Sequence, residues 1–274
     1  MKVLSFVMAG LAALALASPA SAHFMMLYTP EIAKAESSDL DMRVVFTHPA
    51  EAGHTMDMGG VNEFYVVHQR GENAPKKTDL KSFLKEIEWK NPESSGPAFS
   101  ALIPRNQVRS MGDYTFVVVP GYYLEKEEDV YMQQITKLVL NVGGIPGNWS
   151  EPVGLPCEIV PLIKPYGLWT GNVFKGRVMS EGKPVAGAEV EVEYLSHMPD
   201  LEKNMLPEAS SVDYPHDAFV TQTIFSDENG YITFGLPKAG WWGFAALGVG
   251  PVKEHEGKEM SQDAVIWIKA VDMK

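Results

Sequence analysis

Short hydrophobic runs separated by polar turns dominate the chain after its first 22 residues. These runs are rich in β-branched and aromatic side chains and are bordered by Pro, Gly, Asn or Asp, which is typical of β-strands. Long segments with the three- and four-residue spacing of an amphipathic helix are scarce. The pattern predicts a β-sandwich in the first half, with strands at residues 24–28, 40–47, 62–67, 114–119 and 134–141.

One segment of this half, residues 76–89, has helical spacing. Leu80, Phe83 and Leu84 are three and four residues apart, which predicts one or two helical turns. Turn residues then cluster at 143–148 and again at 161–171. We place a domain boundary in the second cluster, which gives domains at residues 23–165 and 166–274.

The second half shows strand-like alternation again, interrupted by two tight turns. The turns contain Gly182-Lys183-Pro184 and Asp227-Glu228-Asn229-Gly230, and the order of strands and turns resembles the transthyretin-like or carboxypeptidase-regulatory sandwich. The Asp227 turn has too few carboxylates at alternate positions for a calcium loop, so we interpret it as a hairpin. The expected fold class is therefore all-β, with an Ig-like N-terminal sandwich and a transthyretin/carboxypeptidase-regulatory-like C-terminal sandwich.

Residues 1–22 have the organisation of a secretory signal peptide. Lys2 precedes an uncharged apolar run, and Pro19-Ala20-Ser21-Ala22 ends in the small-x-small pattern that signal peptidases recognise. A membrane anchor is the alternative, but the run has about 14 residues whereas a spanning helix needs about 20. We expect cleavage after Ala22 and a periplasmic protein that is not inserted in the membrane.

Charge and cysteine content exclude some partners and some forms of stabilisation. The chain has 35 acidic and 23 basic residues, a formal charge of −12, and removal of Lys2 leaves 22 basic residues and a charge of −13. This negative balance disfavours binding to nucleic acid. Cys157 is the only cysteine, so no internal disulfide can form. Its apolar neighbours predict a small core residue rather than a reactive thiol.

Common catalytic motifs are missing from the sequence. It contains no Gly-x-Ser-x-Gly elbow, no Gly-rich phosphate loop before a helix and no His-Glu-x-x-His. We therefore expect a protein that is not an enzyme.

Cleavage after Ala22 would make His23 the first residue of the mature chain, and a terminal histidine has unusual metal chemistry. Its α-amine has a reference pKa of about 7.7 to 8.0 and its imidazole one of about 6.5, so both nitrogens lose their protons readily near neutral pH. One residue then offers two nitrogen ligands to the same ion. Such a pair suits Ni(II), Co(II), Cu(II) and Zn(II), whereas Mg(II) and Ca(II) prefer oxygen. A terminal histidine that lies free in solvent is the alternative.

The expected strand arrangement indicates which other histidines can bind the same metal ion as His23. If the strands at 24–28 and 40–47 are antiparallel neighbours, His23 lies beside His48, and His54 follows in the loop at the same end. His68 ends the next strand, on the order of 17 to 20 Å away at about 3.3 Å per residue, and is excluded. The predicted metal site is therefore His23, His48 and His54, with weaker candidates in the same loop, namely Met56, Asp57 and Met58. Surface or backbone-bonded loop histidines are the alternative.

The remaining candidate residues are less informative. His197, His216 and His255 lie in or beside polar segments and are expected to be exposed to solvent. Trp241 and Trp242 could form a sugar-stacking platform, although aromatic residues that lead into a strand more often belong to a core.

Four ordered motifs resemble a family of exported bacterial proteins that was first catalogued as a domain of unknown function. The motifs are His23-Phe24-Met25-Met26-Leu27-Tyr28, Gly53-His54-Thr55-Met56-Asp57-Met58, the segment 158–162 and the segment 240–247. Members of that family are often described as periplasmic components of ABC/ECF-type cobalt or nickel transport systems. The resemblance covers essentially the whole mature chain. It implies capture of Ni(II) or Co(II) and delivery to a membrane permease.

Two other classes of function stay open at this point. A copper-binding protein or copper enzyme could use the same terminal histidine, and the methionines of the loop are compatible with Cu(I). A module that binds sugars or a protein would instead use the Trp241 region or a sheet edge.

Overall fold

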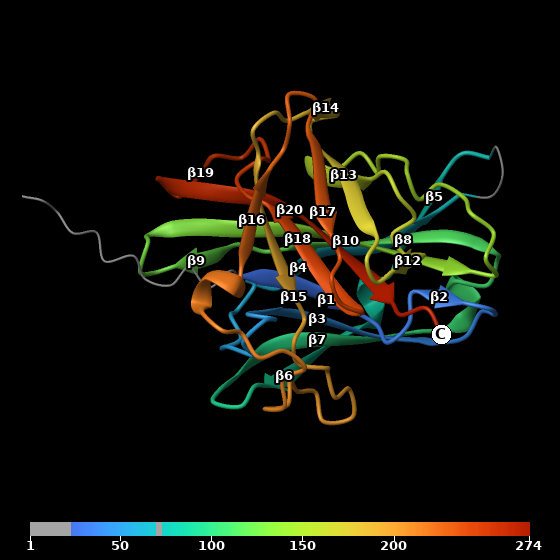
Figure 1. The fold of residues 1–274 in the computed structure, drawn as a ribbon, viewed down its shortest axis with the longest axis horizontal. Coiled ribbons are helices and arrows are strands. Elements are labelled where there is room, and N and C mark those ends of the chain that lie inside the picture. The colour runs from blue at the N-terminus through green and yellow to red at the C-terminus, as the bar shows by residue number, and fades with distance from the viewer. Residues whose placement is uncertain (1–22, 70–72) are drawn as a thin grey trace, which may run out of the picture.

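The computed structural model describes residues 23–69 and 73–274, so the predicted signal peptide lies outside the described residues. The all-β prediction is confirmed (Figure 1). The helical elements of the described chain are three short 3-10 turns, η1 (Lys81–Phe83), η2 (Arg105–Gln107) and η3 (Asp217–Phe219). Within the described ranges, no helix has the length and apolar character needed to cross a membrane.

Strands make up the rest of the regular structure. Those of the first half are β1 (Phe24–Tyr28), β2 (Ala33–Lys34), β3 (Leu40–Thr47), β4 (Val61–His68), β5 (Lys76–Asp79), β6 (Leu84–Lys90), β7 (Ser95–Ile103), β8 (Gly112–Pro120), β9 (Tyr123–Glu125), β10 (Val130–Val142) and β11 (Cys157–Pro161). Those of the second half are β12 (Leu168–Trp169), β13 (Val173–Ser180), β14 (Lys183–Pro184), β15 (Glu189–Tyr194), β16 (Gln222–Phe225), β17 (Tyr231–Gly235), β18 (Gly240–Ala246), β19 (Glu254–His255) and β20 (Lys258–Val271).

A central sheet of 12 strands joins the two halves of the molecule. Its main path runs β16-β15-β18-β20-β10-β8-β4-β5, and β2, β9, β12 and β19 pair with β10 or β20. The expected domain boundary falls between β11 and β12, yet β10 from one side of it pairs in parallel with β20 from the other side. The two sandwiches therefore share one continuous sheet.

Two smaller sheets complete the two sandwiches. One consists of β1, β3, β7 and β6, and the other of β11, β13, β14 and β17. Side chains along a strand alternate between faces, so Phe64 and Val66 of β4 join one core whereas Tyr65 and Val67 join the other.

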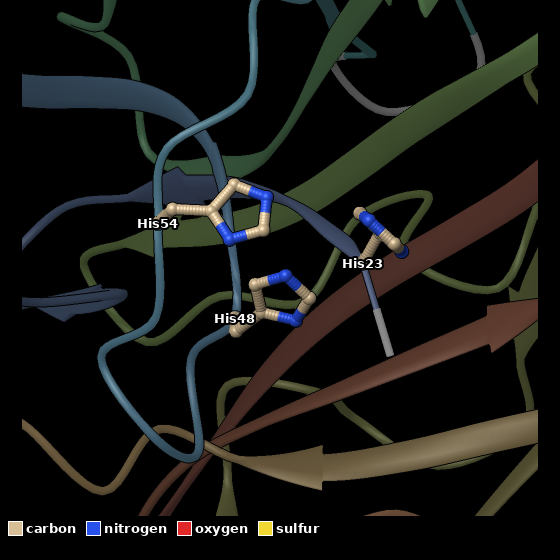
Figure 2. A group of neighbouring side chains, drawn as sticks. All are labelled: His23, His48 and His54. Atoms are coloured by element: carbon tan, nitrogen blue, oxygen red, sulfur yellow. The ribbon is translucent and has the colours of Figure 1, made fainter. Parts of the chain in front are cut away.

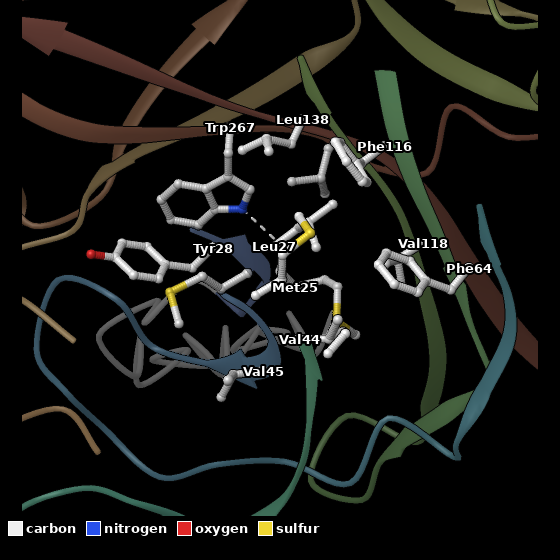
Figure 3. Close-up of a cluster of buried hydrophobic side chains, with 14 of the residues drawn as sticks. Met25, Leu27, Tyr28, Val44, Val45, Phe64, Phe116, Val118, Leu138 and Trp267 are labelled. Atoms are coloured by element: carbon white, nitrogen blue, oxygen red, sulfur yellow. Dashed lines mark hydrogen bonds between the residues drawn. The ribbon is translucent and has the colours of Figure 1, made fainter. Parts of the chain in front are cut away.

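The core that contains Phe64 and Val66, called the first core below, fixes the position of β1. Met25 lies within it, and the Trp267 Nε1–H of β20 donates to the Met25 carbonyl at 2.9 Å (Figure 3). Burial of large side chains stabilises a fold by about 25 cal/mol per Å² of apolar surface removed from water. The N-terminal strand is thus a core element rather than a frayed end.

The segment with helical spacing contains one helical turn, the lower of the two predicted numbers of turns, and most of the rest of it forms strands. Only η1 is helical, while β5 pairs with β4 and β6 pairs with β7. Each of these two strands pairs with one neighbouring strand, and this pairing overrides the weak local helical preference. The segment therefore contributes one helical turn between two strands.

Candidate metal centre

Sheet pairing brings three of the predicted site residues together. Strands β1 and β3 are antiparallel, and Phe24 lies opposite Thr47, so His23 and His48 stand side by side at one end of the pair. His54 comes from the β3–β4 loop (residues 48–60) above that end. One potential ligand atom from each of the three side chains lies within 4.8 Å of the other two, and Figure 2 shows the three rings gathered together.

The three rings form a compact, tilted group. The ring centroid of His48 is 4.6 Å from that of His23 and 4.9 Å from that of His54, while the rings of His23 and His54 are 6.4 Å apart. His48 is only 5% exposed, His23 is half-buried and His54 is exposed. The group therefore has a buried base and a side that is open to solvent.

Local hydrogen bonds give the β3–β4 loop its shape. The Thr47 hydroxyl donates to the carbonyls of Gly53 and His54, both at 3.3 Å, and the Gly53 N–H donates to the His48 carbonyl at 3.3 Å. The Asn91 side chain donates to the Gly53 carbonyl and, at 2.8 Å, to Thr55 Oγ1. A Cβ at position 53 would lie 2.9 Å from the ring of His48. Glycine is thus needed where the loop crosses this imidazole.

The backbone of His23 is held from the central sheet. Gln134 of β10 donates from Nε2 to the His23 carbonyl and accepts at Oε1 from the Met25 N–H, both at 2.7 Å. The same Gln134 Nε2 lies 3.2 Å from Asp263 Oδ2. These bonds hold the backbone of His23 in place without any ligand.

Two residues beside the histidines, Tyr123 and Glu125, were not predicted from the sequence. Glu125 Oε2 lies 3.3 Å from His23 Nε2, and the Tyr123 hydroxyl donates to the same carboxylate oxygen at 3.1 Å. Both residues belong to β9, where alternate side chains share a face. A three-residue strand carries too little hydrophobic pattern to be predicted, although the Tyr123-x-Glu125 spacing was a usable signal.

Burial and charge act in opposite directions on these groups. Burial lowers the pKa of His23 below its ordinary value, with a smaller contribution from nearby His54, while the carboxylate of Glu125 works against that shift. Burial alone would raise the pKa of Glu125, but the Glu127 N–H, the Tyr123 hydroxyl and the two nearby histidines bring it below the ordinary value. The centre thus favours a neutral imidazole beside an ionised carboxylate, and a neutral imidazole is the form that binds metals.

The weaker candidates of the loop lie elsewhere. Met56 and Met58 are 3% and 2% exposed and pack in the first hydrophobic core, so their thioethers serve packing. Asp57 Oδ1 accepts from the Gly59 N–H at 2.9 Å. In the described ranges, the group of possible metal ligands consists of His23, His48 and His54.

Histidines outside the cluster have other partners. His68 Nδ1 is 2.8 Å from the Asp113 carbonyl, and its ring stacks on Tyr114. His216 is exposed, as expected, whereas His255 is half-buried against Tyr122 and Tyr131.

The prediction that His197 is exposed to solvent is wrong. The side chain is 7% exposed, and its Nδ1 lies 2.8 Å from the Pro207 carbonyl. The polar insertion folds back on itself here, because the Ser211 N–H bonds to the Ser196 carbonyl at 2.8 Å. This return of the chain covers a ring that the polar sequence had suggested would be solvated.

Cys157, Trp241 and Trp242 are all core residues. Burial raises the pKa of the Cys157 thiol to about 12, so the thiol stays protonated and unreactive. Trp241 and Trp242 are 1% and 6% exposed, which leaves no face for stacking on a sugar.

Comparison with known proteins gives one extended match. A family model described as a domain of unknown function (DUF4198) matches residues 20–250. No curated protein matches the sequence.

Solved structures give only remote likenesses. The D0-D1 domain of Intimin is 10% identical, with 89% of this chain and 98% of that chain covered and a TM-score of 0.21. The Yersinia pseudotuberculosis adhesin InvE is 14% identical over 91% of this chain and 59% of that one, with a TM-score of 0.23. Salmonella alpha-2-macroglobulin reacted with methylamine is 8% identical, with 90% of this chain and 15% of that chain covered and a TM-score of 0.24. Scores this low support no inference about function.

Proposed function

Because the chain belongs to the DUF4198 family of unknown function, we propose a function from the histidine centre itself. Export and cleavage after Ala22 yield a periplasmic protein that binds Ni(II) or Co(II) through His23, His48 and His54. The protein then delivers the ion to a membrane uptake system. The observation that carries this proposal is the convergence of three imidazoles within 4.8 Å, one of them on the residue that cleavage would expose.

The donor set accounts for the class of metal. Three imidazoles and one α-amine supply four nitrogen ligands, which suits a tetragonal site for Ni(II) or Cu(II) and also accepts Co(II) or Zn(II). The thioethers of Met56 and Met58 are packed in the core, so the soft ligands that would favour Cu(I) are directed elsewhere.

The burial gradient supports capture followed by release. His48 is buried at the base and His54 is exposed at the rim, so an ion can enter from solvent and leave without unfolding of the sheet. Protons compete with metal for the same nitrogens, so a drop in pH weakens binding. A carrier needs this kind of reversible site, whereas a structural metal site is normally closed.

Copper binding is the second candidate, because the same four nitrogens bind Cu(II) more tightly than Ni(II) or Co(II) in the usual order of divalent ions. A copper carrier or redox enzyme would therefore use an identical centre. Cellular metal supply, rather than the ligands alone, would then decide which ion the protein carries.

A competition titration tests the proposal. Processed protein that begins at His23 is loaded with one equivalent of Ni(II), Co(II) or Cu(II) in separate samples, and the bound metal is counted after dialysis and after treatment with a chelator. We expect one ion per chain and complete removal by the chelator. Failure of Ni(II), Co(II) and Cu(II) alike to bind would contradict the proposal. A copper form that turns over a redox substrate would favour the second candidate.

A further inference from the structure

The carboxylate of Glu125 contacts His23 directly but is not one of the proposed metal ligands. We propose that Glu125 is a positioning residue that holds the His23 ring in the Nε2–H tautomer, which leaves Nδ1 to bind the metal together with the α-amine. This inference rests on the proposed function and adds the binding mode of its central ligand.

The covalent structure of histidine makes this choice of nitrogen important. Nδ1 is attached to Cγ, so Nδ1 and the α-amine can reach one ion and close a small chelate ring through Cα, Cβ and Cγ. Nε2 lies on the far side of the imidazole, and its lone pair points away from the amine. A neutral imidazole binds metal only through its unprotonated nitrogen. The terminal residue is therefore bidentate only when Nε2 carries the hydrogen.

The contact with Glu125 favours that form. Glu125 Oε2 lies 3.3 Å from His23 Nε2, and an ionised carboxylate can only accept hydrogen bonds. The contact is thus favourable when Nε2 carries a hydrogen and repulsive when it presents a lone pair. Metal-bound histidines commonly donate their other N–H to a carboxylate or carbonyl in this way, which fixes both tautomer and ring orientation.

Glu125 is itself held in place. The Tyr123 hydroxyl donates to Oε2 and the Glu127 N–H donates to Oε1, both at 3.1 Å. The sheet sets the position of β9, because Glu125 lies opposite Val130 of β10. Strand β10 also carries Gln134, which bonds to the His23 carbonyl. The backbone and the ring of His23 are therefore oriented from the same side of the site.

The tautomer can be measured without any metal. Processed protein labelled with ¹⁵N is studied by long-range proton–nitrogen NMR at neutral pH, as wild type, as Glu125→Ala and as Glu125→Gln. We expect the Nε2–H form in the wild type, a mixture of tautomers in Glu125→Ala, and recovery in Glu125→Gln, since the amide oxygen still accepts a hydrogen bond. Glu128→Ala, a change of an exposed carboxylate on the same hairpin, is the matched control and should behave as wild type.

Binding of Ni(II) alone to the same four proteins completes the test. Loss of an outer carboxylate partner typically weakens metal binding by about 10- to 100-fold, and we expect this range for Glu125→Ala with a smaller loss for Glu125→Gln. An Nδ1–H tautomer in the metal-free wild type, or equal affinity of Glu125→Ala and wild type, would overturn the inference. Equal losses in the Ala and Gln variants would also overturn it, because they would mark Glu125 as a direct ligand. Failure of the wild type itself to bind metal would instead overturn the proposed function.

Discussion

Histidine side chains in two regions of this molecule have opposite surroundings. His68 and His197 each place Nδ1 2.8 Å from a backbone carbonyl, and His68 also stacks on Tyr114. Where β1 begins and β3 ends, His23, His48 and His54 lie with their rings close together, and a carboxylate contacts His23. One set of rings satisfies the backbone of the fold, while the other forms a group that can share a ligand.

The difference follows from strand register. Antiparallel pairing places the residue before β1 beside the residue after β3, and the β3–β4 loop adds a third ring at the same end. His68 ends β4 and lies opposite Tyr114 of β8, so the sheet gives it an aromatic neighbour and a carbonyl. Position relative to strand ends, rather than the local composition around each histidine, therefore separates a possible metal centre from structural histidines.

The largest expected effect comes from removing two histidine side chains from each region, in two separate double variants. The double variant His48→Ala/His54→Ala should lose about a thousandfold or more in Ni(II) affinity, about 4 kcal/mol, because two of the four nitrogen ligands disappear. The matched double variant His68→Ala/His197→Ala should bind Ni(II) as wild type does. It should, however, lose about 1–3 kcal/mol of stability, because the Asp113 and Pro207 carbonyls lose their imidazole partners. Isothermal titration and urea unfolding of both proteins measure the two effects.

Loss of folding in the first double variant would not obscure this result. His54 is exposed, and surface substitutions usually change stability by less than about 0.5 kcal/mol, so His54→Ala alone serves as the second variant. A His54→Ala protein that binds Ni(II) with wild-type affinity would remove this ring from the site. Reduced binding in the His68/His197 variant would erase the distinction between the regions.

A separate effect, on stability rather than on metal affinity, concerns the way the β3–β4 loop is held by the second half of the chain. Glu193 accepts from the Ala50 N–H at 3.4 Å, and the Ser196 N–H donates to the Pro49 carbonyl at 3.2 Å. Burial raises the pKa of Glu193 to about 8, although hydrogen bonds from Thr221 and Ala50 oppose this rise. The loop that carries His48 and His54 thus rests on a carboxyl group that stays protonated at neutral pH.

This raised pKa makes stability depend on pH in a defined direction. Between about 4.5 and about 8 the unfolded chain releases a proton that folded Glu193 keeps, so its contribution to stability falls as pH rises through this window. Glu193→Gln should flatten that decline and stabilise the metal-free protein at pH 8 by a few times 1.4 kcal/mol, about 1.4 for each pH unit of the window. Urea unfolding at both ends of the window measures the difference.

A Glu193→Gln protein with the wild-type pH slope would show that this carboxyl group is already ionised in the folded state.

Much of the arrangement was predictable from local pattern, and the remainder depends on long-range pairing. The bounds predicted for β1 and β3 match those of the structure, and with them the neighbourhood of His23 and His48 followed. Glu125 was not predicted because a three-residue strand is too short to show the alternation of a β-strand. The shared central sheet was also missed, since no local signal reports that β10 pairs with β20. Burial of His197 depends on a return of the chain that composition alone does not indicate.

The central claim is that cleavage creates one of the four nitrogen ligands, the α-amine of His23, and a paired titration tests it most directly. One protein begins at His23 and the other carries a single glycine before it, while all three imidazoles are present in both. We predict that Ni(II) binds the first at least about a hundredfold more tightly, about 2.7 kcal/mol, because only the first offers the α-amine beside the His23 ring. Equal affinities measured by calorimetry would contradict the account.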